Sequence, residues 1–106
     1  MSKQVLADIL AKGLGIAIEK VTTMLNSGSS SYSQPHPGST WVTVVDGTWL
    51  TTDGIVMSAY FHPSRPHTAT TIGKLGTKKS AASAGQWAVS WQTKAAFGNK
   101  AYYDTQ

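Results

Sequence analysis

The sequence predicts a mainly β fold: a small antiparallel β-sandwich of about five to six short strands, preceded by an N-terminal amphipathic helix and a flexible linker. Three observations support this fold class. After residue 40, apolar and polar residues alternate with a period of two in several short segments. Turn-forming Gly, Pro and Asp residues separate these segments. Before residue 27, apolar residues instead recur every three or four positions, which is typical of a helix.

Composition limits the protein to one domain at most, because the chain has 106 residues. Charged residues make up 13% of it, about half the usual share, and the formal net charge is +4. A positive excess favours anionic partners such as bacterial wall polymers, lipid head groups or nucleic acid, although a merely soluble basic surface accounts for it equally well. The chain has no Cys, which excludes a thiolate zinc site, a disulfide scaffold and a cysteine nucleophile.

Residues 2–26 are predicted to form one helix, and Gly13 and Gly15 weaken its middle by about 1 kcal/mol each relative to Ala. Its apolar face is too wide to remain in water. It is expected to pack on a partner or on copies of itself, on the domain's own core, or on a membrane surface. The positions predicted to dock a partner are Leu6, Leu10, Leu14, Val21 and Met24.

No apolar run approaches the roughly 20 residues of a membrane-spanning helix. Asp8 and Lys12 interrupt the first apolar stretch, so the N-terminus makes a poor secretory signal. Residues 27–39, rich in Ser, Gly and Pro, are predicted to be a linker. Within it, His36 stands between two prolines and is interpreted as a solvated residue.

Residues 40–106 are predicted to be the β-domain. In the first strand Val42 and Val44 face one way, while the residues between and beside them face the other. Asp46–Gly47 and Asp53–Gly54 are turn signals. Further strands are expected at residues 55–62, 67–75, 86–91 and 100–104, with residues 76–83 as a connection and the last two strands paired as a hairpin.

Several short motifs follow one another in this β-domain. They are GTW at residues 47–49, SAY at 58–60 with His62 and His67 after it, AGQWA at 84–88 and GNKAYY at 98–103. This order resembles the lactococcin 972 type of bacteriocin over roughly residues 46–104. The resemblance implies a sandwich of two three-stranded antiparallel sheets. It also implies a secreted antibacterial protein that is not an enzyme, binds lipid II and blocks septum formation in related bacteria.

A second hypothesis belongs to another functional class. The N-terminal helix and linker stand where such bacteriocins normally carry a cleavable leader. The second hypothesis is therefore that the chain is a non-catalytic structural or adaptor subunit of a larger secreted toxin assembly. This subunit would dock through residues 2–26.

Catalysis is not expected, because His62 and His67 flank a proline-bounded loop without a nucleophile-elbow motif and the acids are scarce. The two histidines are close enough in sequence to share a metal ion, with His36 or Asp53 as the only third ligand available. The alternative is that they make loop hydrogen bonds. No cofactor and no metal is predicted.

The predicted ligand contacts are basic and aromatic residues of the β-domain. Arg65 suits a pyrophosphate or teichoic phosphate best, because its planar fork matches phosphate oxygens. Tryptophans are expected mainly in the core, and no nucleic-acid motif is found. The predicted partner is a cell-envelope target, either lipid II or a wall polymer. The residues expected to contact it are Trp49, Tyr60, His62, Arg65, His67, Lys78, Lys79, Tyr102 and Tyr103.

Overall fold

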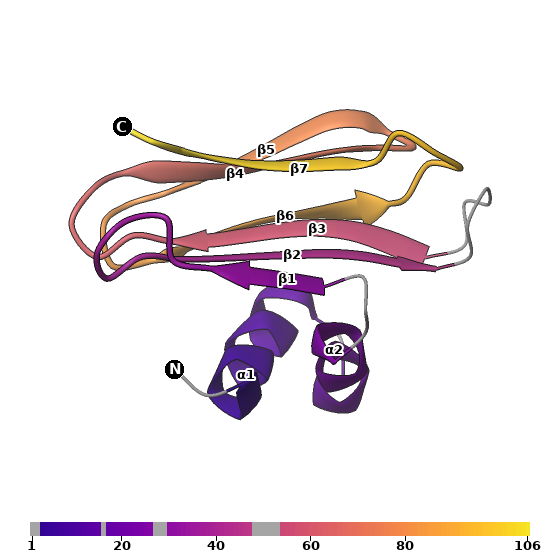
Figure 1. Cartoon of the computed structure of the whole chain (residues 1–106), viewed down its shortest axis with the longest axis horizontal. Coiled ribbons are helices and arrows are strands. Elements are labelled where there is room, and N and C mark those ends of the chain that lie inside the picture. The colour runs from indigo at the N-terminus through magenta and orange to yellow at the C-terminus, as the bar shows by residue number, and fades with distance from the viewer. Residues whose placement is uncertain (1–2, 16, 27–29, 48–53) are drawn as a thin grey trace.

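Two helices and seven strands make up the described part of the computed structural model, which covers residues 3–15, 17–26, 30–47 and 54–106 (Figure 1). The helices are α1 (Lys3–Leu14) and α2 (Ile18–Leu25). The strands are β1 (Ser30–Ser33), β2 (Thr40–Gly47), β3 (Gly54–Phe61), β4 (His67–Gly73), β5 (Gly76–Ala82), β6 (Trp87–Thr93) and β7 (Lys100–Thr105).

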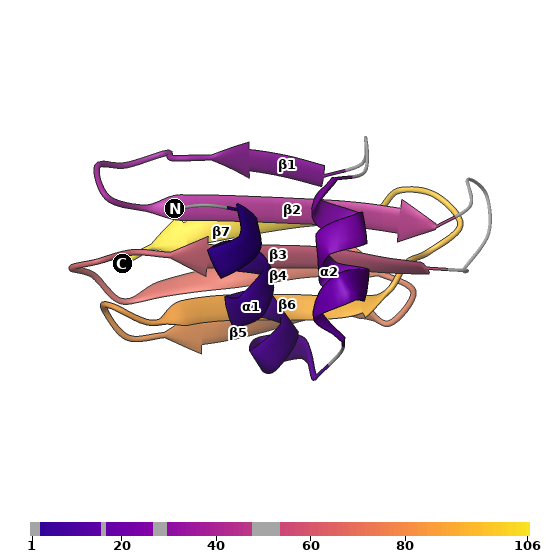
Figure 2. The same ribbon diagram turned by 90° about the horizontal axis from the view of Figure 1, so that it is seen from below.

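The strands form two antiparallel sheets, with strand orders β1-β2-β3-β6 and β5-β4-β7. The sheets lie face to face, and both helices cover the other face of the four-stranded sheet (Figures 1 and 2). The predicted mainly β sandwich with a helical N-terminus is therefore confirmed.

The sheets have four and three strands, whereas the resemblance implied three and three. The extra strand is β1, which lies inside the predicted linker and pairs with residues 41–44 of β2. Its sequence, SSYS, has no apolar alternation. An edge strand needs only backbone hydrogen bonds to its neighbour, so the side-chain pattern gave no signal for it.

The prediction of one helix over residues 2–26 was wrong. Gly15 adopts a φ of 71°, a left-handed conformation that ends an α-helix, and its N–H donates to the Ala11 carbonyl at 2.9 Å. The chain then turns back, and α1 and α2 lie side by side across the sheet (Figure 2). The apolar face is thus divided between two short helices that pack on the same surface.

An apolar core fills the space between the helices and the four-stranded sheet. Its buried members are Ala7, Leu10, Val21, Val42, Val44, Met57 and Ala59. Leu10 and Val21, two of the predicted docking positions, thus pack inside this chain and are not exposed to a partner. The side chains of Leu6, Leu14 and Met24 lie outside the described part, and docking through the helix remains a prediction.

Two details of the strand prediction were also wrong. The predicted connection at residues 76–83 contains β5, an edge strand whose residues are mostly exposed and therefore lack an apolar pattern. The last two strands do not form a hairpin: β6 pairs with β3, and β7 pairs with β4 in the opposite sheet. The loop between them crosses from one sheet to the other (Figure 1).

Candidate functional site

Three histidines and two tyrosines meet at one end of the sandwich, and we call this group the histidine cluster. Its members are His36, Tyr60, His62, His67 and Tyr103. Ring centroids lie 6.0 Å apart for His36 and His62, and 6.3 Å apart for His62 and His67. The cluster joins the β1–β2 connection, the end of β3, the start of β4 and strand β7, so it exists only in the folded chain.

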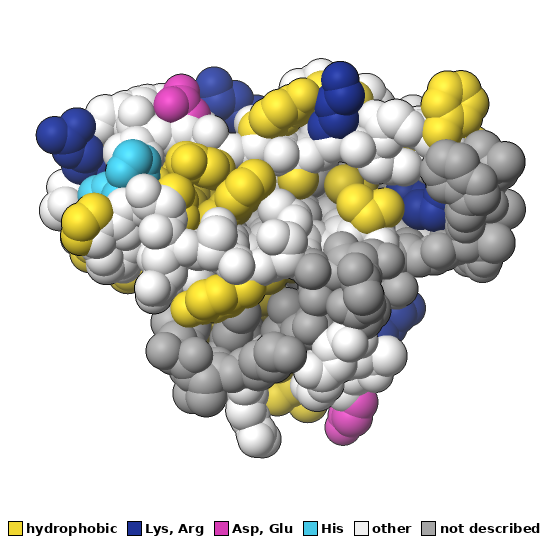
Figure 3. Space-filling view, in the orientation of Figure 1, with side chains coloured by type: hydrophobic (Ala, Val, Ile, Leu, Met, Phe, Trp, Pro, Cys, Tyr) yellow, Lys and Arg dark blue, Asp and Glu magenta, His cyan; other side chains and the backbone are white. Residues whose placement is uncertain are grey.

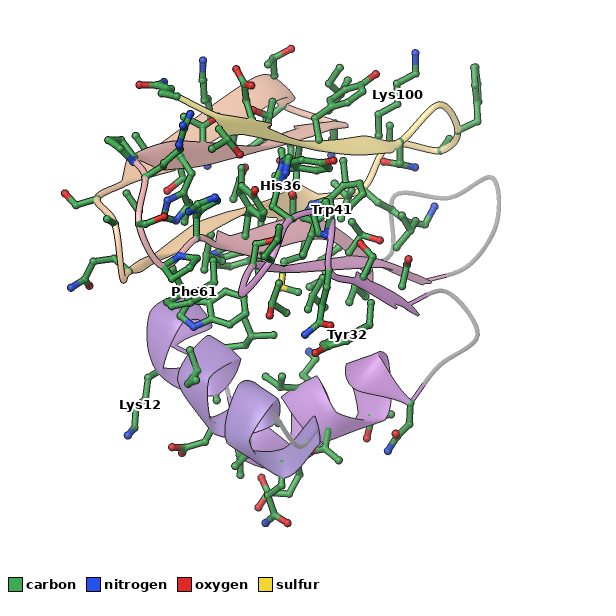
Figure 4. The ribbon with its side chains drawn as sticks, turned by 60° about the vertical axis from the view of Figure 1, so that its left-hand side comes forward. Lys12, Tyr32, His36, Trp41, Phe61 and Lys100 are labelled. Atoms are coloured by element: carbon green, nitrogen blue, oxygen red, sulfur yellow. The ribbon has the colours of Figure 1, made fainter. Side chains whose placement is uncertain are left out.

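His36 is held in place by a closed turn before β2. Its N–H donates to Ser39 Oγ at 2.8 Å, and that hydroxyl donates back to the His36 carbonyl at 2.8 Å. Ser39 is fully buried. His36 is exposed, as predicted, but its ring also lies 6.3 Å from that of Tyr103, below the three-stranded sheet and near Trp41 (Figure 4). Its interpretation as a linker residue missed this contact.

His62 is fixed in one tautomer by the loop that follows it. Its Nδ1 accepts hydrogen bonds from the backbone N–H groups of Ser64 at 3.2 Å and Arg65 at 3.1 Å, so the ring proton of the neutral form resides on Nε2. Burial lowers the pKa of His62, and the nearby His36, His67 and Arg65 lower it further. The ring is therefore a neutral donor at neutral pH.

His67 and Tyr60 form the buried floor behind this residue. The two ring nitrogens of His67 lie 2.8 Å from the Arg65 carbonyl and 2.7 Å from the Gln86 carbonyl, which ties the β3–β4 loop to the start of β6. Tyr60 is fully buried, and its hydroxyl lies 2.7 Å from Thr105 Oγ1. Both residues position the site rather than contact solvent.

A pocket of about 650 Å³ opens beside the histidine cluster. Its lining residues are His36, Pro37, His62, Ser64, Arg65, Tyr103, Asp104 and Thr105. Exposed Arg65 contributes the positive charge. Tyr103 contributes an aromatic wall, and its ring centroid lies 4.7 Å from that of Trp41 and 4.8 Å from that of Tyr60. This combination suits an anionic group attached to a ring-shaped moiety, because guanidinium groups bind phosphate oxygens and aromatic faces stack on rings.

The structure brings together only some of the predicted contact residues. His62, Arg65 and Tyr103 line the pocket, and His67 and Tyr60 lie behind it. Lys78 and Lys79 lie on β5 and Tyr102 on β7, all exposed and outside the pocket lining, while Trp49 falls outside the described residues. The predicted contacts did not include five of the lining residues: His36, Pro37, Ser64, Asp104 and Thr105. The sequence carries no signal for the last three, whereas the position of His36 between two prolines was a clue that its segment is structured.

The described residues contain no group of three His, Asp or Glu side chains placed to hold a metal ion. The proposed shared ligation by His62 and His67 also conflicts with their contacts, because His62 Nδ1 and both nitrogens of His67 already face backbone groups. Asp53 falls outside the described residues. Among the helices described, none has the length and apolarity to cross a membrane.

A sequence model of the lactococcin 972 bacteriocins matches residues 37–103, which is more than half of the chain. The protein belongs to the lactococcin 972 bacteriocin family. Searches of curated proteins and of solved structures find no match. The family region includes His62, Ser64, Arg65 and Tyr103 of the pocket, whereas His36 stands just before it. Membership supports an antibacterial role and is consistent with the secretion typical of the family.

Proposed function

We propose that this protein is secreted, that it is not an enzyme, and that it inhibits competing bacteria by binding a pyrophosphate-bearing cell-envelope precursor such as lipid II. Family membership supports the antibacterial part of the proposal. The observation that supports this choice of ligand is the pocket, in which Arg65, the His62 ring and the Tyr103 ring share one opening. Binding the precursor would withhold it from wall and septum synthesis.

The pocket's donors match the oxygens of a pyrophosphate. The Arg65 guanidinium presents paired N–H donors at a spacing suited to two phosphate oxygens. The neutral His62 ring keeps its Nε2 proton for donation, since Nδ1 is occupied by the loop backbone. Ser64 adds a hydroxyl at the rim. Together these groups bind an anion without a metal ion.

The remaining pocket residues suit the sugar that such a precursor carries next to its phosphates. Tyr103 and His36 offer aromatic surface, and the Asp104 carboxylate offers an acceptor for hydroxyl or amide hydrogens. The preferred ligand therefore combines phosphate with a polar ring.

A binding role is also favoured over catalysis by the hydrogen bonds at the site. Ser64 is the pocket hydroxyl closest in sequence to His62, yet His62 Nδ1 accepts from the Ser64 backbone N–H rather than from its hydroxyl. A nucleophilic serine requires a base hydrogen-bonded to its Oγ. The arrangement around Ser64 thus lacks the pairing that would activate it.

Lipid II binding is the direct test, measured with lipid II in detergent micelles or nanodiscs by calorimetry and compared with growth inhibition of Gram-positive strains. Replacing Arg65 with Gln (R65Q) is expected to weaken binding by about 10- to 100-fold, since hydrogen bonds to charged groups are strong. The matched control is Lys12→Gln, which removes the same charge from an exposed side chain of α1 (Figure 4). If the wild-type protein neither binds lipid II nor inhibits any strain, the proposal fails.

A further inference from the structure

Charge is divided unequally between the two halves of the sequence. Residues 62–106 contain six of the nine basic residues and only one of the five acidic residues, Asp104. This half forms the whole three-stranded sheet and strand β6. The helices carry acids as well as bases, and Asp8 pairs with Lys12 at 3.4 Å. The three-stranded side of the molecule is therefore strongly positive and the helical side is not.

The outer face of the three-stranded sheet presents lysines beside a tyrosine. Thr70 of β4 pairs with Lys79 on one side and with Tyr102 on the other, and the side chains of antiparallel partners share a face. Lys79 is exposed, and 46% of Tyr102 is exposed. Two residues further along β4, on the same face, Ile72 pairs with Lys100. Among the described elements, none covers this face (Figure 1).

Two large apolar side chains project from loops at one end of this sheet. Leu75, in the β4–β5 turn, is 65% exposed, and Phe97, in the β6–β7 loop, is 69% exposed. The pairings Gly73–Gly76 and Ile72–Lys100 place both loops at the same end. Figure 3 shows hydrophobic and basic side chains next to one another along this upper side of the molecule. We call Lys74, Leu75, Lys79, Phe97, Lys100 and Tyr102 the basic face.

We propose that the basic face docks the protein onto an anionic lipid bilayer. Lysines on a surface are attracted to anionic head groups. Exposed Leu and Phe at loop tips can insert among the acyl chains, and Tyr favours the interface between head groups and hydrocarbon. A purely electrostatic partner such as nucleic acid accounts for the lysines but gives no role to Leu75 and Phe97. The mixture of charge and apolar tips selects the bilayer.

The apolar loops of the basic face are separate from the pocket. The pocket lies at the His67 end of β4, and the apolar loops lie at the Gly73 end, roughly 20 Å away for a strand of this length. Bilayer docking consequently stands independently of lipid II recognition. In a cell it would hold the protein at the surface in which membrane-anchored precursors reside.

The test uses the full chain and vesicles that contain no lipid II. We expect co-sedimentation with phosphatidylglycerol vesicles, weakening as salt rises, and little with phosphatidylcholine vesicles. The double variant Lys79→Gln/Lys100→Gln should bind about 30-fold more weakly. The matched control, Lys12→Gln/Lys20→Gln on the helical side, should bind as the wild type does. Circular dichroism would verify that each variant is folded.

A second variant separates insertion from simple charge attraction. Leu75→Ser/Phe97→Ser keeps every charge and should still lose about 10-fold or more in vesicle affinity, because apolar burial in the bilayer is lost. Unchanged affinity in this variant would overturn the proposal. So would absent binding to phosphatidylglycerol, an equal loss in the helical-side control, or equally tight binding of a DNA oligonucleotide. None of these results alters the separate lipid II measurement.

Discussion

The two faces of the four-stranded sheet bury different kinds of side chain. On the helix side, Val42, Val44 and Met57 meet aliphatic residues of α1 and α2 in an apolar core. On the side facing the second sheet, an apolar cluster around Tyr60 lies beside buried hydrogen bonds between side chains and to the backbone. There Gln92 Nε2 donates to the Gly76 carbonyl at 2.8 Å, and Thr71 Oγ1 lies 2.9 Å from Ser90 Oγ. Neighbouring residues of one strand serve the two faces, since side chains alternate.

This difference separates stability from positioning. Apolar contacts are non-directional, so the helix side contributes burial with little geometric demand. Hydrogen bonds between buried side chains fix distances, and an unpaired group is costly. The polar interface also reaches the site: Trp41 Nε1 donates to Ser58 Oγ at 2.9 Å, and that hydroxyl donates to the Tyr102 carbonyl at 2.8 Å. The pocket is therefore positioned by the hydrogen-bonded interface between the two sheets.

Leu10→Ala should have the largest effect, because Leu10 is fully buried on the helix side. The substitution leaves a cavity, and we expect the free energy of unfolding to fall by about 3 kcal/mol, measured by urea denaturation. Leu75→Ala, at a 65% exposed position, is the matched control and should change it by less than about 0.5 kcal/mol. If Leu10→Ala lowered the free energy of unfolding as little as Leu75→Ala does, the helices would contribute little to the core.

Gln92→Leu tests the polar side. Gln92 donates to the Gly76 and Thr71 carbonyls and accepts from the Leu75 N–H at 2.8 Å. The substitution therefore leaves these backbone groups without their hydrogen-bond partner. We expect a loss of about 2 kcal/mol despite the gain in apolarity. Gln34→Leu, at an exposed position, is the control. Increased stability of Gln92→Leu would mean that this interface behaves like the apolar one.

Two threonines of β4 give a smaller, paired comparison. Thr71 Oγ1 has hydrogen-bond partners in Ser90 and Gln92, whereas the buried Thr68 Oγ1 has none in the described part of the chain. Thr71→Val should lower the free energy of unfolding by about 1 kcal/mol, and Thr68→Val should leave it unchanged or raise it. Thermal and urea denaturation of both variants would measure this contrast, and equal losses would contradict it.

His62 should contribute the smallest effect, visible only as a pH dependence. Its pKa is lowered from the ordinary value of 6.5, so the folded state binds a proton less readily than the unfolded state. This contribution to stability is complete above pH 6.5 and is lost as pH falls through the lower, folded pKa. His62→Asn keeps an acceptor for the loop N–H groups without titrating in this range. Its stability should fall less than that of the wild type between pH 7.5 and 5, by denaturation midpoints.

Several features were predictable from local pattern. The alternation around Val42 and Val44 predicted which residues face the apolar core, and the opposed faces of Tyr102 and Tyr103 match an exposed ring and a partly buried one. The site was predicted less completely. His62 and Arg65 were identified through their loop, but His36 was interpreted as a linker residue because nothing in PHP indicates a ring 26 positions away in sequence.

By itself the sequence determined the β-sandwich class, its helical N-terminus, the family and most strand positions, because these depend on local periodicity and on the order of short motifs. Only the tertiary structure decided that Gly15 folds the helix back, that SSYS becomes an edge strand, and that β6 and β7 belong to different sheets. It also assembled the pocket from the β1–β2 connection, the β3–β4 loop and β7. Each of these outcomes has a local alternative that the sequence pattern allows equally well. Contacts between residues far apart in the chain decide which alternative is adopted.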